Sequence, residues 1–312
     1  MTSRLPAMLY HPCYSELNLA ANHRYPINKY RTLYQKLLKL GIAESAFTLS
    51  KPLTVEALTQ FHCPAYVQSL QDGSIDAKAM RRIGFPWSTQ LFERSLCSLG
   101  GTLQTAQAAL TTGIALHLSG GYHHAFYREG SGFCLFNDLV VAAKSMLQQG
   151  LDKILIVDLD VHQGDGSALM LQDEPRIISC SLHCEKNFPY RKQTSDWDIA
   201  LAKDCSDQHY LDAVSESLHT LMHWHKPDLV IYDAGVDIHQ NDELGLLTIS
   251  TEAIYRRDLL VLQRCAEQQV PVAAVIGGGY QRDIDALVHL HLQLFKAAFT
   301  VLGADVASKI KT

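Results

Sequence analysis

The chain has 312 residues, of which 47% are hydrophobic and 19% charged, and its formal net charge is −5. It is long enough to bury the core of one large α/β domain or of two smaller domains. The acidic balance excludes a protein-wide positive field for a nucleic-acid backbone, so we expect no direct nucleic-acid binding. We also expect a cytoplasmic protein, because the sequence has neither an apolar signal core nor a membrane span of roughly 20 apolar residues.

The eight cysteines are scattered through the chain without a Cys-x-x-Cys pair. We interpret most of them as small buried hydrophobic residues in a protein that occupies a reducing compartment. This pattern argues against a zinc site built from thiolates. Any metal site is therefore expected to use histidine and carboxylate ligands.

The N-terminal third combines one predicted strand with several predicted helices. Residues 7–10 predict a strand, and residues 27–40 predict a helix. Thr54 is suited to cap a short helix, which an amphipathic pattern then extends along the chain. Residues 81–87 predict a loop rich in aromatic side chains, and a long core helix is expected over residues 88–110.

Beyond residue 113, apolar runs alternate with stretches of helical periodicity. The predicted strands cover residues 114–118, 154–157, 177–182, 229–232 and 272–276. The predicted helices cover residues 139–149, 211–225, 253–268 and 284–299. This alternation indicates a mainly parallel sheet with helices on both faces. Because no repeat or linker divides the sequence, we expect residues 1–312 to form a single three-layer α/β domain.

The stretch 154–166 changes from an apolar run to an acidic one and ends in a Gly-Asp-Gly sequence. We interpret it as a buried strand that delivers metal ligands, since a side-chain period of two places Asp158, Asp160 and His162 on one side. Unpaired charges at a buried position cost more free energy than packing returns, so these groups need a cation or polar partners. The alternative is a capped strand-to-helix turn with solvated acids.

Polar clusters follow four of the five strands predicted after residue 113. These clusters are residues 119–124, 158–166, 233–237 and 277–280. Ligands of open α/β sheets bind beyond the carboxyl ends of the strands. We therefore expect the four clusters to build one site.

A metal held by Asp160 and His162 needs a third ligand, for which Asp237 is the best candidate. The spacing leaves Asp233 open as an alternative ligand, and both acids could instead cap loops. Two carboxylates and one imidazole are typical of a catalytic zinc site, whereas structural zinc sites are rich in thiolates. Oxygen-rich ligation also admits Fe²⁺, Mn²⁺ or Co²⁺.

His123 and His124 are adjacent, and Asp158 and Asp165 are left over after metal ligation. The economical arrangement is two Asp–His pairs, in which each carboxylate fixes the tautomer of one imidazole and raises its basicity. Such a pair would deprotonate a water that attacks a carbonyl. Tyr280 follows three glycines, and its hydroxyl is suited to polarise the carbonyl oxygen. A surface tyrosine in a glycine-rich turn is the alternative for this motif.

Taken together, these motifs resemble the histone deacetylase superfamily over nearly the whole chain. The matching segments are residues 120–125, 132–134, 158–166, 234–237 and 278–280. Three further segments resemble the class IV, histone deacetylase 11-like branch and its bacterial relatives, namely residues 82–86, 242–250 and 279–281.

The resemblance implies the arginase-deacetylase fold, a parallel sheet of eight strands between layers of helices. It also implies hydrolysis of an N-acyl amide on a lysine side chain of a protein or peptide. By the same resemblance, Asp160, His162 and Asp237 would bind one Zn²⁺.

The resemblance also assigns roles to the remaining polar residues. His124, paired with Asp165, would act as general base and acid, and His123, paired with Asp158, would stabilise charge. Tyr280 would polarise the acyl carbonyl. These roles make the two histidines chemically different although they are neighbours in the chain.

Substrate contacts and a second ion follow from the same resemblance. A tunnel for the aliphatic stem of the substrate would be lined by Phe133 and Phe188, with Leu244 at its rim and the Gly132 carbonyl near the scissile amide. A potassium ion would be held by backbone or hydroxyl oxygens of Asp158, Asp160, His162, Ser181 and Leu182.

The chain departs from the family pattern before the long helix, where many members carry an acid that holds the substrate backbone. Residues 83–87 contain no acid, so we expect a different grip on the peptide. Class IV relatives are similar to enzymes that remove long fatty acyl groups, which makes a larger acyl pocket one expectation.

The leading hypothesis is a zinc-dependent lysine deacylase. One alternative is an amidohydrolase for small acylated amines such as acetylpolyamines. A non-catalytic acyl-lysine binding protein is a second alternative, for which a missing ligand, histidine or tyrosine is expected. A third alternative, an arginase-like two-metal hydrolase, would want a carboxylate at position 164, where the chain has Gly164.

Overall fold

Successive side chains of each strand point to opposite faces of the sheet, so the core is divided into two apolar layers. On β4 (Ile154–Asp158), Ile154 and Ile156 belong to one hydrophobic cluster, whereas Leu155 and Val157 belong to another. All four side chains are buried, as expected for a strand that is covered on both faces. The computed structural model describes residues 5–312, so residues 1–4 of the predicted domain lie outside the described part.

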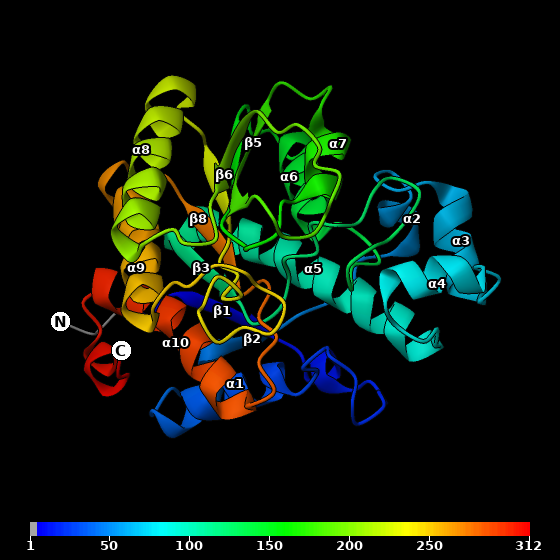
Figure 1. Ribbon diagram of the computed structural model, residues 1–312, viewed down its shortest axis with the longest axis horizontal. Helices are drawn as coiled ribbons and strands as arrows, with labels where there is room; N and C mark the ends of the chain where they lie inside the picture. The colour runs from blue at the N-terminus through cyan, green and yellow to red at the C-terminus, as the bar shows by residue number, and fades with distance from the viewer. Residues whose placement is uncertain (1–4) are drawn as a thin grey trace.

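The strands form one eight-stranded sheet in the order β2-β1-β3-β8-β7-β4-β5-β6 (Figure 1). All neighbouring strands in it run parallel. Besides β4, the strands are β1 (Ala7–Tyr10), β2 (Phe47–Leu49), β3 (Ile114–His117), β5 (Ile177–Cys184), β6 (Trp197–Leu201), β7 (Leu229–Asp233) and β8 (Val272–Val275). The predicted α/β class and arginase-deacetylase fold are confirmed, and the sheet is parallel throughout.

Helices cover both faces of the sheet (Figure 1). They are α1 (Lys29–Lys39), α2 (Val55–Leu58), α3 (Pro64–Asp72), α4 (Ala77–Ile83), α5 (Thr89–Thr112), α6 (Asp138–Gln148), α7 (Asp165–Leu171), α8 (Asp207–His225), α9 (Thr251–Glu267) and α10 (Ile284–Val301). Three 3-10 helices complete the fold, η1 (Pro12–Ser15), η2 (Glu44–Ala46) and η3 (Asp305–Lys309). Helix α6 packs in the layer of Ile154 and Ile156, and α8, α9 and α10 pack in the layer of Leu155 and Val157.

Several predicted elements were wrong in their bounds or type. Residues 81–83 are not a loop but the last turn of α4, which Asp76 caps at its start and Gly84 ends at a φ of 93°. Strands β2 and β6 and helix α7 were not predicted. The residues of β6 alternate between intermediate and exposed positions over most of its length, so it lacks the apolar run that marks the central strands.

The strand that was expected to carry Asp158, Asp160 and His162 ends at Asp158. The Asp158 carboxylate accepts a hydrogen bond from the Asp160 amide at 3.2 Å, and the Asp160 carboxylate accepts one from the His162 amide at 2.9 Å. These side-chain bonds bend the chain after Leu159, whose amide still donates to the Asp233 carbonyl of β7. Asp160 and His162 therefore reach the site from a loop at the carboxyl end of β4.

Of the helices within residues 5–312, none combines the length and the apolar character that crossing a bilayer demands.

Candidate active site

Asp160, His162 and Asp237 come together at the carboxyl ends of β4 and β7. One ligand atom from each of the three lies within 4.8 Å of the others. Nδ1 of His162 is 2.9 Å from Asp160 Oδ1 and 3.2 Å from Asp237 Oδ2. All three side chains are buried. The structure thus gathers the three residues that were expected to bind a metal.

The environment of these residues fits a divalent metal ion. Oδ2 of Asp237 is buried and accepts no hydrogen bond, although a buried carboxylate oxygen needs a cation or a donor. Burial, together with the neighbouring Asp160 carboxylate, raises the pKa of Asp237 to about 7. A set of two carboxylates and one imidazole suits catalytic zinc and the other borderline divalent metals.

A glycine-rich turn after β8 closes over the two carboxylates. The Gly278 amide donates a hydrogen bond to Asp160 Oδ2 at 3.0 Å. A Cβ atom on Gly278 would lie 2.2 Å from Oδ2 of both Asp160 and Asp237. Glycine is therefore required here for the close approach of the backbone. The sequence analysis had connected these glycines only with the freedom of Tyr280.

Asp233, the alternative third ligand, lies apart from this group. Its carboxylate belongs to a second cluster with His123 and Asp158, again with ligand atoms within 4.8 Å of one another. Both Asp233 oxygens are buried without a hydrogen-bond partner, and burial raises the pKa of this acid well above its usual value. An uncharged carboxyl group is the expected form at such a position.

The two adjacent histidines each pair with one aspartate. Nδ1 of His123 lies 2.7 Å from Asp158 Oδ2, and Nδ1 of His124 lies 2.7 Å from Asp165 Oδ1. The Nε2 atoms of the two imidazoles are 3.2 Å apart. Because the histidines lie in a loop rather than in a strand, both rings face the same space. The geometry matches the two Asp–His pairs that the sequence suggested.

The surroundings move the pKa values of the two imidazoles in opposite directions. Burial lowers the pKa of His123, but the Asp158 and Asp160 carboxylates outweigh burial and hold that pKa well above its usual value. Burial and the neighbouring His123 lower the pKa of His124 to about 4, although Asp165 opposes the shift. These shifts favour a neutral imidazole on His124, which can accept a proton, and a positively charged imidazolium on His123.

Two residues at the start of α6 hold the histidine loop, and the sequence analysis did not single them out. The Asn137 side chain donates hydrogen bonds to the carbonyls of His123 and Ala125 at 3.3 and 3.1 Å. The buried Asp138 carboxylate accepts a bond from the Tyr122 amide at 2.7 Å. An Asn-Asp sequence at a helix start is an ordinary cap, so the sequence offered no sign of this second role.

Tyr280 lies at the opposite side of the site, partly buried. Its amide donates a hydrogen bond to Asp242 Oδ2 at 2.7 Å, which fixes the backbone of the tyrosine. Burial and the Asp160 and Asp237 carboxylates raise the pKa of the Tyr280 phenol well above its usual value, so the hydroxyl remains a proton donor. The positioning role of Asp242 was not predicted.

A buried lysine on α1 is hydrogen-bonded to the backbone of the glycine-rich turn. Nζ of Lys29 donates a hydrogen bond to the Gly277 carbonyl at 2.8 Å. Burial lowers the pKa of Lys29 to about 8, and the nearby Asp237 and Asp160 carboxylates oppose the shift. Lysine is rarely buried, and nothing in the sequence pointed to this contact.

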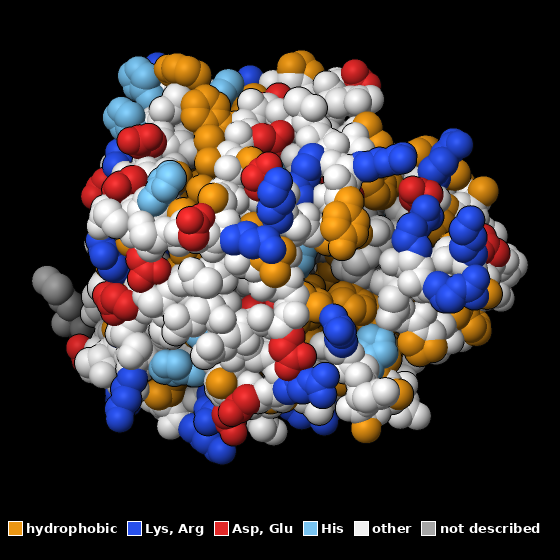
Figure 2. Space-filling view, in the orientation of Figure 1, with side chains coloured by type: hydrophobic (Ala, Val, Ile, Leu, Met, Phe, Trp, Pro, Cys, Tyr) orange, Lys and Arg blue, Asp and Glu red, His pale blue; other side chains and the backbone are white. Residues whose placement is uncertain are grey.

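A cavity of about 450 Å³ opens above these residues. Figure 2 shows a hollow near the middle of this face, with hydrophobic side chains at its walls. The four predicted tunnel residues, Gly132, Phe133, Phe188 and Leu244, all line the cavity. The prediction missed other lining residues, including Arg24, Arg82, Lys186, Tyr190, Glu243 and Leu246.

The residues expected to hold potassium lie beside the metal ligands. Asp158 of β4 is paired in register with Ser181 of β5, and Leu182 follows in the same strand. The Ser181 hydroxyl lies 3.0 Å from His183 Nδ1. A potassium ion at this place stays a prediction.

Residues 23–294 match the model of the histone deacetylase domain, and the chain belongs to the histone deacetylase family. This confirms the family predicted from the motifs. Membership implies a hydrolase that acts on amides.

Individual relatives agree with this assignment. An uncharacterized protein of Picosynechococcus is 46% identical over 93% of this chain and 97% of its own length. Histone deacetylase 2 of Arabidopsis thaliana is 32% identical over 59% of this chain, and the match spans about half of that relative (49%). The crystal structure of a histone deacetylase homolog from Aquifex aeolicus superposes with a TM-score of 0.83 at 23% identity. It covers 97% of this chain and 85% of that one, which shows the shared fold.

Proposed function

We propose that the protein is a zinc-dependent lysine deacylase that hydrolyses an N-acyl amide on the lysine side chain of a protein or peptide. The observation that carries the proposal is the complete set of side chains around one cavity. Asp160, His162 and Asp237 would hold Zn²⁺, because their buried donor atoms lie within 4.8 Å of one another and Asp237 Oδ2 accepts no hydrogen bond. When bound, the ion would polarise the acyl carbonyl and make water easier to deprotonate.

The protein side chains would carry the proton transfers. His124 accepts the proton of the attacking water at Nε2, and Asp165 at Nδ1 keeps the ring in the required tautomer. The same imidazole then returns the proton to the lysine nitrogen as the amide bond breaks. His123 remains protonated beside it and stabilises negative charge. The Tyr280 hydroxyl donates a hydrogen bond to the carbonyl oxygen as charge develops there.

The cavity lining supports an acyl-lysine chain rather than a free polyamine. Phe133 and Phe188 are aromatic walls for an aliphatic stem, and Phe188 packs 4.9 Å from the His124 ring, between centroids. A cationic polyamine would need carboxylates in the cavity. Among the lining residues Glu243 is acidic, and its carboxylate is already paired with Arg282 at 3.1 Å.

A substrate panel tests this proposal. Peptides with acetyl-, octanoyl- and myristoyl-lysine are compared with free acetylpolyamines, each with and without a metal chelator. We expect turnover of at least one peptide that the chelator removes and added Zn²⁺ restores. The acyl length that is preferred tests the class IV assignment. Absence of chelator-sensitive turnover on every acyl length would overturn the proposal, and turnover of polyamines alone would favour the small-amine hydrolase.

A further inference from the structure

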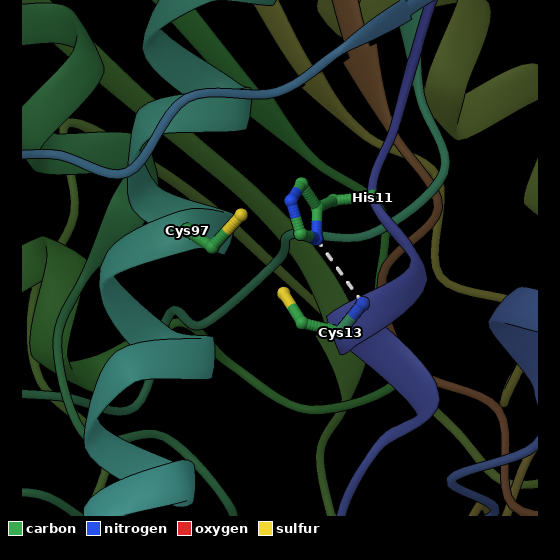
Figure 3. A group of neighbouring side chains, drawn as sticks. All are labelled: His11, Cys13 and Cys97. Atoms are coloured by element: carbon green, nitrogen blue, oxygen red, sulfur yellow. Dashed lines mark hydrogen bonds between the residues drawn. The ribbon is translucent and has the colours of Figure 1, made fainter.

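Three side chains outside the candidate active site meet near the β2 edge of the sheet, namely His11, Cys13 and Cys97 (Figure 3). Cys13 lies in η1 and Cys97 on α5, and one ligand atom of each of the three side chains lies within 4.8 Å of the others. Cys97 is 4% exposed and Cys13 is partly exposed. The proposed function uses none of these residues.

The imidazole is engaged in a way that disfavours metal binding. Nδ1 of His11 accepts a hydrogen bond from the Cys13 amide at 3.1 Å and so caps η1. Burial lowers the pKa of His11, which keeps the ring neutral. A neutral imidazole that accepts at Nδ1 carries its proton on Nε2 and has no second lone pair to give to a metal. The chemistry of this cluster is therefore expected at the two sulfur atoms.

The two thiols have different acidities. Contact with Cys13, and the guanidinium of Arg94, lower the pKa of the Cys97 thiol against the effect of burial. Contact with Cys97, reinforced by burial, raises the pKa of the Cys13 thiol. Of the two thiols, Cys97 therefore ionises more readily to the nucleophilic thiolate, and Cys13 beside it stays protonated.

We propose that Cys13 and Cys97 are a redox-active pair that hydrogen peroxide converts into a disulfide. The Cys97 thiol loses its proton and the thiolate attacks one peroxide oxygen, so that the O–O bond breaks and a sulfenic acid forms. The hydroxide that departs takes up the proton from Cys97 and leaves as water. The Cys13 sulfur then attacks the sulfenic sulfur. Its proton and the departing hydroxyl leave as water. In total, two thiols and one peroxide give one disulfide and two waters.

A chain of hydrogen bonds connects this pair to the segment before the catalytic histidines. The hydroxyl of Tyr14, the neighbour of Cys13, lies 2.8 Å from His117 Nε2. Nδ1 of His117 lies 3.0 Å from the Thr102 hydroxyl, which donates to Asp138 at 2.6 Å. Asp138 in turn accepts the Tyr122 amide at 2.7 Å.

A second connection starts at Ser98, the neighbour of Cys97. Its hydroxyl lies 2.7 Å from that of Ser119 and donates to that of Tyr122 at 3.3 Å. The sulfur atoms of a disulfide are about 2.0 Å apart, so closing the bond would move η1 relative to α5. Both hydrogen-bonded chains end at Tyr122, so this movement would reach the residue before His123. We therefore expect oxidation to lower turnover, a consequence that rests on the proposed function.

The full-length, metal-loaded enzyme is treated with hydrogen peroxide, alkylated under denaturing conditions and mapped by peptide mass. We expect a disulfide between Cys13 and Cys97, the loss of two of the eight free thiols, and recovery with dithiothreitol. Cys13→Ser and Cys97→Ser prevent the bond, and Cys205→Ser, at another buried cysteine, leaves it intact. His11→Asn keeps an acceptor for the Cys13 amide, and its disulfide forms as in the wild type.

The proposal would be overturned if Cys13 and Cys97 stayed reduced, or if either formed a disulfide with another cysteine. Protection of both thiols by added Zn²⁺ in the wild type but not in His11→Asn would also overturn it, and would assign a metal site instead. These readouts need no turnover, so they stand even if the proposed function fails. The effect of the disulfide on the active site is tested by measuring turnover after peroxide treatment. We expect the wild type to lose most of its turnover and Cys13→Ser to keep its own. Equal losses in the two proteins would refute the connection between the cysteine pair and turnover.

Discussion

The two histidine–aspartate pairs have the same contact distance of 2.7 Å, but the pKa values of their imidazoles are shifted in opposite directions. His123 is buried beside the carboxylates of Asp158 and Asp160, which outweigh burial and raise its pKa. Burial and the neighbouring imidazoles of His123 and His162 lower the pKa of His124 to about 4. The local contact therefore orients each ring, whereas burial and the charges beyond the contact decide which ring accepts a proton.

The largest effect is expected from removing the ring that accepts the proton. His124→Ala should lower kcat by about 10²–10⁴-fold, because general-base catalysis is lost. His123→Ala is the matched variant in the neighbouring pair and should lower kcat less, since a charge rather than a proton acceptor is removed. Steady-state kinetics on metal-saturated variants checks the order. A larger loss in His123→Ala would reverse the assignment of the two pairs.

Tyr280→Phe should lower kcat by about 10²–10³-fold, as expected for one missing donor to the developing oxyanion. Its metal content should stay at the wild-type level, because the hydroxyl acts on the substrate. Tyr255→Phe serves as the control, because the Tyr255 hydroxyl on α9 lies 3.3 Å from the Thr300 hydroxyl on α10. Wild-type turnover in Tyr280→Phe would refute the role of the phenol.

Asp158→Asn should reduce the difference in pKa between His123 and His124 while both imidazoles remain in place. The substitution removes the carboxylate that contributes most to raising the pKa of His123, so that pKa should fall in an NMR titration of the imidazoles. Turnover should fall by about 10–100-fold, as is typical when a supporting carboxylate is lost. An unchanged His123 titration would mean that the Asp160 carboxylate suffices to hold the proton.

Metal affinity should depend on pH through His162. The Asp160 and Asp237 carboxylates outweigh burial and raise the pKa of this imidazole to about 10 in the metal-free protein. A metal ligand must be deprotonated, so binding displaces this proton and affinity should rise about tenfold per pH unit below that pKa. Competition with a chelator at several pH values measures the slope. An affinity independent of pH would mean that the metal displaces no proton from His162, and would contradict the raised pKa.

Much of the site was predictable because its residues follow buried strands in the sequence. Asp160, His162 and Asp237 stand just after apolar runs, and parallel strands present their carboxyl ends at one edge. The supporting residues gave no such signal. Lys29 reaches Gly277, 248 residues away in the sequence, through one backbone carbonyl. Asn137 also acts by bonding to backbone groups, and such contacts depend on the folded chain rather than on a motif.

The fold was predictable where burial is complete and less so at the margins. The central strands β4 and β7 are buried at every position and read as continuous apolar runs. At the two edges of the sheet, β2 and β6 expose alternate or successive residues, so neither composition nor periodicity marked them. The turn after Asp158 was missed because two side-chain hydrogen bonds, rather than a glycine or proline, end the strand.

In the proposed mechanism, Asp160, His162 and Asp237 hold the metal ion on which turnover depends. The most direct test compares Asp237→Ala with Asp233→Asn, because both positions carry buried acids of the same segment and Asp233 lies outside the ligand group. Metal per chain and turnover of an acyl-lysine peptide are measured on each. We expect Asp237→Ala to lose both and Asp233→Asn to keep its metal. An Asp237→Ala protein that retains the metal and wild-type turnover would contradict the account.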